Sequence, residues 1–204
     1  TRQRLEEMQT FLDVQARTDE LTGLANRRGF KEYLGESEQR REKGKGSFAV
    51  IIGDLDNFKQ INDDHGHEVG DFVLQEIGHI LKVLVRSEDL VVRWGGEEFL
   101  VLMADTDLQG AKILAEKIRQ KIASTSVAVD GGLVTVTMSL GVDAQKPQGD
   151  LYSTLGSADK AMYEAKRRGR NCVVTAEGDE KFSDSSSGDS SLTAPKYSSP
   201  TVGL

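Results

Sequence analysis

The chain has 204 residues, and 26 Lys and Arg residues against 33 Asp and Glu give it a formal net charge of −7. This length predicts one globular domain, and the acidic balance excludes a protein that coats a nucleic acid polymer, because such binding needs a positive face. The only cysteine, Cys172, cannot form an intrachain disulfide, which excludes a disulfide scaffold and indicates a reducing compartment. The longest apolar runs have about six residues, against roughly 20 for a membrane span, so we expect a cytoplasmic domain without direct membrane insertion. The chain does not begin with Met and is expected to be a piece of a longer protein, whose attachment to a membrane stays open.

Residues 1–17 contain neither Gly nor Pro, and Leu5, Met8 and Leu12 follow the spacing of a heptad seam. We therefore expect a helical connector here, as the end of an upstream region. Two heptads do not separate a coiled coil from an amphipathic helix that lies on the domain, and both alternatives stay open.

Residues 18–178 alternate between helical and strand patterns. The expected helices cover residues 28–43, 72–84, 107–124 and 151–168, and the expected strands cover residues 48–52, 90–94, 99–103, 133–142 and 172–175. A tight hairpin turn is expected at Gly95 and Gly96, because glycine tolerates the positive φ that both central positions of such a turn require. This order predicts an α/β fold with a mixed central sheet flanked by helices. The Ser-rich residues 179–204 lack a periodic apolar pattern and are expected to form a disordered tail.

Four acidic residues stand close to strand ends: Asp54 and Asp56 follow a buried strand, and Glu97 and Glu98 follow the glycine pair. Their charges would repel one another unless a cation lay between them, and Mg²⁺ prefers hard oxygen ligands completed by water and phosphate groups. Lys59 could bring a positive charge to a polyphosphate at the same place. A merely solvated carboxylate is the better interpretation of Asp54 alone, but the whole set indicates a magnesium site.

The residues around the glycine pair also resemble a known signature. Arg93-Trp94-Gly95-Gly96-Glu97-Glu98-Phe99 is similar to the motif of the diguanylate cyclase family, the GGDEF domain, in its GGEEF form. Four further blocks agree with that family in order and spacing, at residues 19–28, 54–63, 66–71 and 161–171. The resemblance implies a GGDEF domain over residues 18–178, with a fold like that of nucleotide cyclases and the polymerase palm.

This resemblance implies that two GTP molecules condense to cyclic di-GMP with release of two pyrophosphates. Each protomer of a homodimer would bind one GTP, and each ribose 3′-oxygen would attack the α-phosphate of the other GTP. Mg²⁺, two ions per active site with Mn²⁺ as a substitute, would be held by Asp54, the backbone carbonyl of Leu55 and Glu97, with Glu98 assisting. Glu97 would also help to deprotonate the 3′-hydroxyl, and Lys59 would stabilise the transition state, so that Glu97, Glu98 and Lys59 are the implied catalytic residues.

Other matches to the family concern the nucleotide. Lys166 and Arg170 match residues that grip the terminal phosphates, and His67 matches a position near the nucleotide. Asn62 and Asp71 match positions that read guanine. A carboxylate accepts the N1–H and N2–H₂ donors of guanine, whereas adenine has an acceptor at N1, so Asp71 favours GTP over ATP. An N-cap role for Asp71 at the start of a helix is the alternative.

A second site is indicated by Arg86-Ser87-Glu88-Asp89, which resembles the RxxD inhibitory motif of the family. Product bound there would act away from the catalytic centre and hold the domains apart. The supporting arginine of the family is Lys117 in this chain, and because lysine cannot form a bidentate contact we expect weaker product binding. A solvated charged turn is the alternative for Arg86 and Asp89.

Two further features of the sequence are a histidine pair and a tryptophan within the signature. His65 and His67 form a His-x-His pair, but further ligands at zinc spacing are missing, so no zinc site is expected. Trp94 is expected to be a packing residue.

The rival function is a catalytically silent GGDEF module that binds GTP or cyclic di-GMP as a receptor, although such modules usually lack a metal ligand or a turn glycine that this chain retains.

Overall fold

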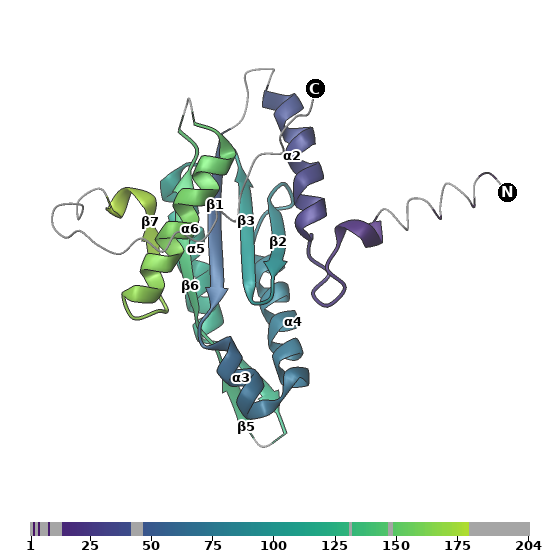
Figure 1. Ribbon diagram of the computed structural model, residues 1–204, viewed down its shortest axis with the longest axis vertical. Coiled ribbons are helices and arrows are strands. Elements are labelled where there is room, and N and C mark those ends of the chain that lie inside the picture. The colour runs from purple at the N-terminus through teal and green to yellow at the C-terminus, as the bar shows by residue number, and fades with distance from the viewer. Residues whose placement is uncertain are drawn as a thin grey trace, which may run out of the picture.

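The computed structural model of the protein describes residues 2, 4, 8, 14–41, 47–130, 132–146 and 149–179 (Figure 1). Within the expected connector, Met8 and residues 14–17 are helical, whereas Leu5 and Leu12 of the heptad seam lie outside the described residues. The expected tail lies outside them from residue 180 onward. Across the described ranges, no helix is both long enough and apolar enough to cross a lipid bilayer.

Five helices and seven strands follow one another along the part of the chain from residue 27 to residue 175. The helices are α2 (Arg27–Arg41), α3 (Phe58–His65), α4 (His67–Leu84), α5 (Leu108–Ala123) and α6 (Leu151–Arg167). The strands are β1 (Phe48–Leu55), β2 (Leu90–Gly95), β3 (Glu98–Ala104), β4 (Ser126–Val129), β5 (Gly132–Thr135), β6 (Met138–Ala144) and β7 (Val173–Thr175). Asp107 and Asp150 fix the starts of α5 and α6, because each carboxylate accepts a hydrogen bond from a backbone N–H of the first helical turn.

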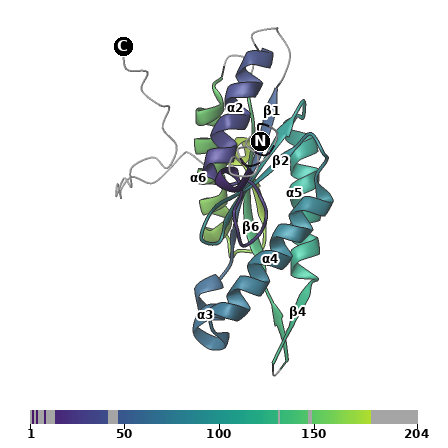
Figure 2. The same cartoon turned by 90° about the vertical axis from the view of Figure 1, so that its right-hand side faces the viewer.

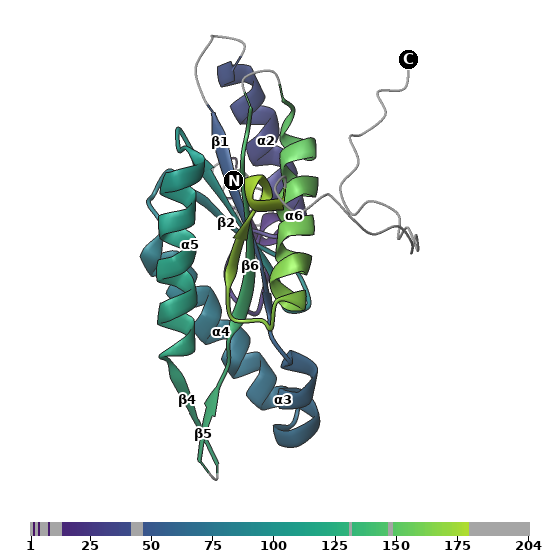
Figure 3. The same cartoon turned by 90° about the vertical axis from the view of Figure 1, so that its left-hand side faces the viewer.

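The central sheet has the strand order β2-β3-β1-β6-β7. Its neighbouring strands are antiparallel except β6 and β7, which are parallel, so the expected mixed α/β architecture is confirmed. Strands β4 and β5 form a separate two-stranded hairpin that extends beyond the end of the sheet, beside α3 (Figure 3).

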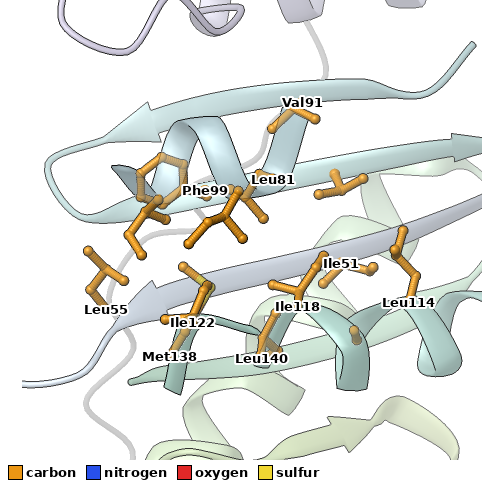
Figure 4. Packing of buried hydrophobic residues seen from close by; sticks show 14 of the residues in the cluster. Ile51, Leu55, Leu81, Val91, Phe99, Leu114, Ile118, Ile122, Met138 and Leu140 are labelled. Atoms are coloured by element: carbon orange, nitrogen blue, oxygen red, sulfur yellow. The ribbon is translucent and has the colours of Figure 1, made fainter. Parts of the chain in front are cut away.

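Helices cover both faces of the central sheet. Figure 2 shows α2 and α6 on one face and α4 and α5 on the other. On the α4 and α5 face, Ile51 and Leu55 of β1 pack with Ile118 and other buried side chains (Figure 4). On the opposite face, Val50 and Ile52 pack with residues of α2 and α6. Each fully buried aliphatic side chain of this kind contributes about 1.5–3 kcal/mol, so both layers hold the strands firmly.

Helix α6 lies unusually close to β6. A side chain at Gly141 would overlap the backbone carbonyl oxygen of Ala158 and the backbone nitrogen of Met162, so only glycine permits this contact. The close packing fixes α6 along the sheet and brings its C-terminal turn to the end of β1, where the acidic residues lie (Figure 1).

Two sequence-based expectations need correction. The strand expected at residues 133–142 is two strands, because β5 pairs with β4 and β6 pairs with β1. The apolar alternation continues through Val134, Val136 and Met138, all buried, so the pattern cannot reveal the change of partner. The hairpin turn lies one residue later than expected: Gly95 pairs with Glu98, and Gly96 (φ 53°) is the only central residue with positive φ.

Candidate active site

The acidic residues continue the alternation of β1 on the face that α2 and α6 cover. Val50 and Ile52 belong to the apolar cluster on that face, and Asp54 is the next residue in the same direction. Asp54 pairs directly with Glu98 of β3 in the sheet register. Directly paired residues lie on the same face, so β1 and β3 bring two carboxylates side by side.

Asp54 is only 6% exposed, and its carboxylate meets a cation from α6. The Nζ atom of Lys166, in the last turn of that helix, lies 2.7 Å from Asp54 Oδ1. Burial raises the pKa of Asp54, and the charges of Glu97 and Glu98 raise it further, against the opposing effect of Lys166. Lys166 therefore does not offset the effect of burial on the Asp54 carboxyl group, and additional positive charge next to Asp54 would be favourable.

The donor set at this end of the sheet fits a divalent cation in its chemistry. Asp54, Glu97 and Glu98 offer carboxylate oxygens, which Mg²⁺ prefers, and burial together with the two neighbouring glutamates raises the pKa of Asp54. In the part of the chain that the structure describes, however, no three His, Cys, Asp or Glu side chains are gathered as a metal-holding group.

Asp56 does not belong with the other carboxylates, which corrects our expectation of a four-carboxylate cradle. It is 5% exposed. Its Oδ1 accepts a hydrogen bond from Ser139 Oγ (2.6 Å), and its Oδ2 accepts bonds from Thr137 Oγ1 (2.7 Å) and the backbone N–H of Asn171 (3.0 Å). Protein donors thus satisfy both oxygens, and Asp56 connects segments of the fold.

Two arginines hold the glycine turn in place. Arg93 donates from Nη2 to the carbonyl of Gly96 (2.9 Å), and its Nη1 lies 3.1 Å from Asp19 Oδ1 and 3.2 Å from Asp19 Oδ2. Arg27 donates from Nε to the carbonyl of Trp94 (2.6 Å) and also stacks over the Trp94 ring, 5.0 Å from its centroid. The turn that carries Glu97 is therefore fixed from the start of the domain.

Trp94 itself is a packing residue, as expected. It is buried and meets Phe30 edge to face, with 5.2 Å between the ring centroids.

Helices α3 and α4 bring the residues expected to read guanine close together. Asn62 lies on α3, and a side chain at Gly70 of α4 would overlap its amide oxygen, so the two helices touch next to Asp71. Asp71 lies inside α4, which begins at His67 with Gly66 as its N-cap, so the N-cap alternative for Asp71 is wrong. Asp71 and His67 are both exposed, as is Lys59 in the first turn of α3.

Arg170 follows α6 in a loop with left-handed backbone geometry. Gly169, Arg170 and Asn171 have φ values of 109°, 66° and 46°. Arg170 is exposed and lies four residues after Lys166, so the structure brings both expected phosphate-binding residues to the same end of α6.

Arg86, Ser87 and Asp89 of the RxxD motif line a groove of 470 Å³. This groove is lined by residues 23–25, Lys82, residues 85–87 and residues 89–91. Asp89 Oδ2 accepts a hydrogen bond from the backbone N–H of Arg86 (3.2 Å), and burial raises the pKa of Asp89 although Arg86 opposes it. Lys117 is exposed on α5 and does not line the groove, so the structure brings Arg86 and Asp89 together without it.

Several residues that support the site through hydrogen bonds could not be recognised from the sequence. Thr137 and Ser139 occupy the polar positions of a strand pattern that is otherwise half buried, and nothing in that pattern distinguishes a hydroxyl that binds Asp56 from one that faces solvent. Asp19 and Asn171 lie in motif blocks, but their partners are 74 and 115 residues away in the chain. Only the folded sheet could reveal these pairs.

Comparisons with known proteins agree with this geometry. Residues 16–172 match a family model described as "Diguanylate cyclase, GGDEF domain". The response regulator PleD of Caulobacter vibrioides is 43% identical over 160 residues, which are 77% of this chain and 35% of that protein. Diguanylate cyclase DgcS of Shewanella oneidensis is 36% identical over 161 residues, which are 79% of this chain and 53% of that protein. The chain thus spans about a third to a half of the length of these two curated relatives.

Solved structures share the fold. The coiled coil and GGDEF domain of DgcB from Caulobacter crescentus, solved in complex with c-di-GMP, superposes with a TM-score of 0.80 at 30% identity, over 85% of this chain and 92% of that one. The active GGEEF domain of a diguanylate cyclase from Vibrio cholerae superposes with a TM-score of 0.63 at 30% identity, over 69% of this chain and 90% of that one.

Proposed function

Because this chain belongs to the diguanylate cyclase family of GGDEF domains, we propose that it condenses two GTP molecules to cyclic di-GMP and releases two pyrophosphates. The observation that carries this proposal is the collection of charge at the end of β1. There a buried Asp54 faces Glu98 across the sheet, and the last turn of α6 brings Lys166 to the same point. A site of this kind suits the binding of a metal ion and a polyphosphate together.

In the proposed mechanism, Asp54, the backbone carbonyl of Leu55 and Glu97 hold Mg²⁺, with Glu98 assisting. We expect two ions per active site, with Mn²⁺ as a substitute. When bound, the metal neutralises charge on the phosphate and lowers the pKa of the attacking hydroxyl. Glu97 takes the proton of the ribose 3′-hydroxyl, and its position in a turn held by Arg93 supports that role, because a proton acceptor needs a fixed place.

The cations of the site act on the phosphates. Lys166 and Arg170 grip the terminal phosphates, and Lys59 stabilises the charge that develops at the α-phosphate. Asn62 and Asp71 read the base, which selects guanine because a carboxylate accepts its two adjacent N–H donors. Helices α3 and α4 touch at Asn62 and Gly70, and this contact supports a joint role of the Asn62 and Asp71 side chains. His67 lies in the first turn of α4.

The reaction needs two active sites that face each other, so the catalytic species in this proposal is a homodimer in the cytoplasm. Product then inhibits the enzyme through the groove that Arg86 and Asp89 line. The DgcB structure in complex with c-di-GMP supports product binding by this fold. Because Lys117 stands outside the groove, Arg86 supplies the guanidinium contact alone, and we expect weaker inhibition than with a supporting arginine.

A catalytically silent receptor for GTP or cyclic di-GMP is the alternative function. The experiment that separates the two uses the purified protein with GTP and Mg²⁺ and measures cyclic di-GMP by mass spectrometry. We expect product, with a specific activity that rises with protein concentration while the dimer dissociates. Glu97→Gln is expected to abolish turnover with an unchanged circular dichroism spectrum. Tight GTP binding without product at every protein concentration would establish the receptor instead.

A further inference from the structure

Asp56 is a buried carboxylate at the active end of β1 that the proposed mechanism does not use. Its three hydrogen bonds come from two places in the chain. Thr137 and Ser139 bind it from the start of β6, and the backbone N–H of Asn171 binds it from the loop after α6. The side chain therefore joins the end of β1, the start of β6 and the loop that contains Arg170.

That loop has a backbone conformation that needs support. Arg170 and Asn171 have φ values of 66° and 46°, in the left-handed region that L-residues with a side chain avoid. Residues in this region are disfavoured relative to ordinary backbone, so they persist where the surroundings hold them. Gly169, with φ 109°, ends α6 and makes the first step into this region.

Hydrogen bonds from two sides provide the support. The backbone N–H of Arg170 donates to the carbonyl of Ala165 (3.1 Å), which fastens the loop to α6. Asn171 donates its backbone N–H to Asp56, and its side-chain oxygen accepts a bond from Arg119 Nη1 (3.1 Å). Asp56 is the only one of these partners that reaches the loop from the central sheet.

We propose that Asp56 is a positioning residue for the nucleotide: through the N–H of Asn171 it fixes Arg170 beside Lys166, so that both cations meet the phosphates of one GTP molecule. This inference rests on the proposed function of Arg170 and Lys166. It replaces the expectation that Asp56 holds metal, and it explains why a carboxylate so close to Asp54 is bound entirely by protein donors.

Two substitutions at the same position separate positioning from metal binding. Asp56→Asn keeps an acceptor oxygen for the Asn171 N–H, and its NH₂ group can donate to a hydroxyl oxygen, because hydroxyl groups rotate. Asp56→Ala removes the acceptor. We expect Asp56→Asn to keep the KM for GTP within about threefold of wild type and Asp56→Ala to raise it about tenfold or more, with a smaller change in kcat. A metal ligand would lose activity in both variants.

A second pair of variants tests whether the effect passes through Arg170. Arg170→Ala is expected to raise the KM for GTP, and adding Asp56→Ala to it is expected to raise the KM no further, since the positioned group is already gone. Ser139→Ala is the matched control, because it removes a hydrogen bond from the same carboxylate but leaves the bond to Asn171. Its KM is expected to stay at the wild-type value.

Hydrogen exchange of the Asn171 amide provides a readout that needs no catalysis. We expect NMR to show this amide protected in wild type and Asp56→Asn and exchanging rapidly in Asp56→Ala. If Asp56→Ala does not fold, Arg119→Ala loosens Asn171 from the other side and is expected to raise the KM by a smaller factor. Unchanged Asn171 exchange and unchanged KM in the variant that folds would overturn the inference. A wild-type protein that binds GTP without turnover would overturn the proposed function alone, and titration calorimetry of the same variants would then test the positioning.

Discussion

Two carboxylates of this domain each face a cation, and their pKa values move in opposite directions. Asp19 Oδ1 lies 3.1 Å from Arg93 Nη1, and Asp54 Oδ1 lies 2.7 Å from Lys166 Nζ. Burial acts against ionisation at both sites. At Asp19 the hydrogen bonds of Thr22 and Arg93 outweigh it, and the pKa is lowered. At Asp54 burial prevails over Lys166, and the pKa is raised.

The opposite pKa shifts distinguish a carboxylate with a structural role, Asp19, from one at a candidate binding site, Asp54. Asp19 receives both a hydroxyl and a backbone N–H bond from Thr22 in addition to Arg93 Nη1, which contacts both of its oxygens, and together these groups outweigh burial. Asp54 meets one ammonium group while two glutamates lie nearby, so its charge is not compensated. Protein stability alone would not favour this second arrangement, and a group whose protein environment leaves its charge unbalanced is a candidate for ligand binding.

The largest effect expected from this comparison is on activity. Asp54→Asn is expected to lower the rate of cyclic di-GMP formation by about three orders of magnitude, because in the proposed mechanism it removes a central ligand of the metal ion. Steady-state product formation measures the rate. Asp19→Asn is the control, and we expect it to keep activity within about tenfold of wild type under conditions where it is folded. Equal losses of activity in Asp54→Asn and Asp19→Asn would contradict the distinction between the two carboxylates.

Product inhibition extends the comparison to a third carboxylate. Asp89 resembles Asp54, since burial raises its pKa although Arg86 lies next to it in the groove. Arg86→Ala is expected to cause an about tenfold increase in the concentration of cyclic di-GMP that halves the rate, because the proposed charged contact to the product is lost. Progress curves with added product measure this effect. Lys112→Ala, at an exposed position of α5, is the control, and an unchanged progress curve for Arg86→Ala would show that the groove is not used.

A smaller effect concerns stability at Asp19. Asp19→Asn is expected to lower the free energy of unfolding by about 1–2 kcal/mol at neutral pH, because Arg93 and Thr22 lose a charged partner. A lowered pKa in the folded state means that this stabilisation is present above the unfolded pKa and disappears as the pH falls through the folded pKa. Urea unfolding should therefore show the difference from wild type closing in acid. A difference that persists there would contradict the assignment.

The smallest expected effect is on thermal stability at Asp54, and its sign is opposite to that at Asp19. Because its pKa is raised in the fold, the protonated carboxyl contributes stability below the unfolded pKa, and this contribution is lost as the pH rises through the folded pKa. Asp54→Asn remains neutral and is expected to raise the melting temperature by a few degrees at neutral pH, with the gain disappearing in acid. A melting temperature below that of wild type at neutral pH would show that the Lys166 pair stabilises the fold after all.

The fold could be predicted from the sequence where one apolar pattern corresponds to one strand or helix. The apolar run that became β1 and the helices that begin after Asp107 and Asp150 lie close to their expected positions, because burial and capping are local patterns. The break between β5 and β6 could not be predicted, because both halves of the expected strand bury alternate residues against different neighbours.

The candidate site could be predicted in part. Asp54, Glu98 and Lys166 were expected at one site, and the structure brings them together. Asp56 was expected with them because spacing alone cannot distinguish two acidic residues on the same face of a strand. Its hydrogen bond to the backbone of Asn171 decides its role, and that bond links residues 115 positions apart.

The sequence by itself determined the family, the composition of the charged end and the net charge of −7 that excludes a nucleic acid coat. Residue types and short spacings carry this information, and they do not depend on distant contacts. The tertiary structure alone decided which carboxylates are compensated. Asp19 meets Arg93 and Asp54 meets Lys166 only after the strands pair and α6 packs against β6 at Gly141. The balance of charge at a site depends on burial and on partners far away in the chain, and folding creates both.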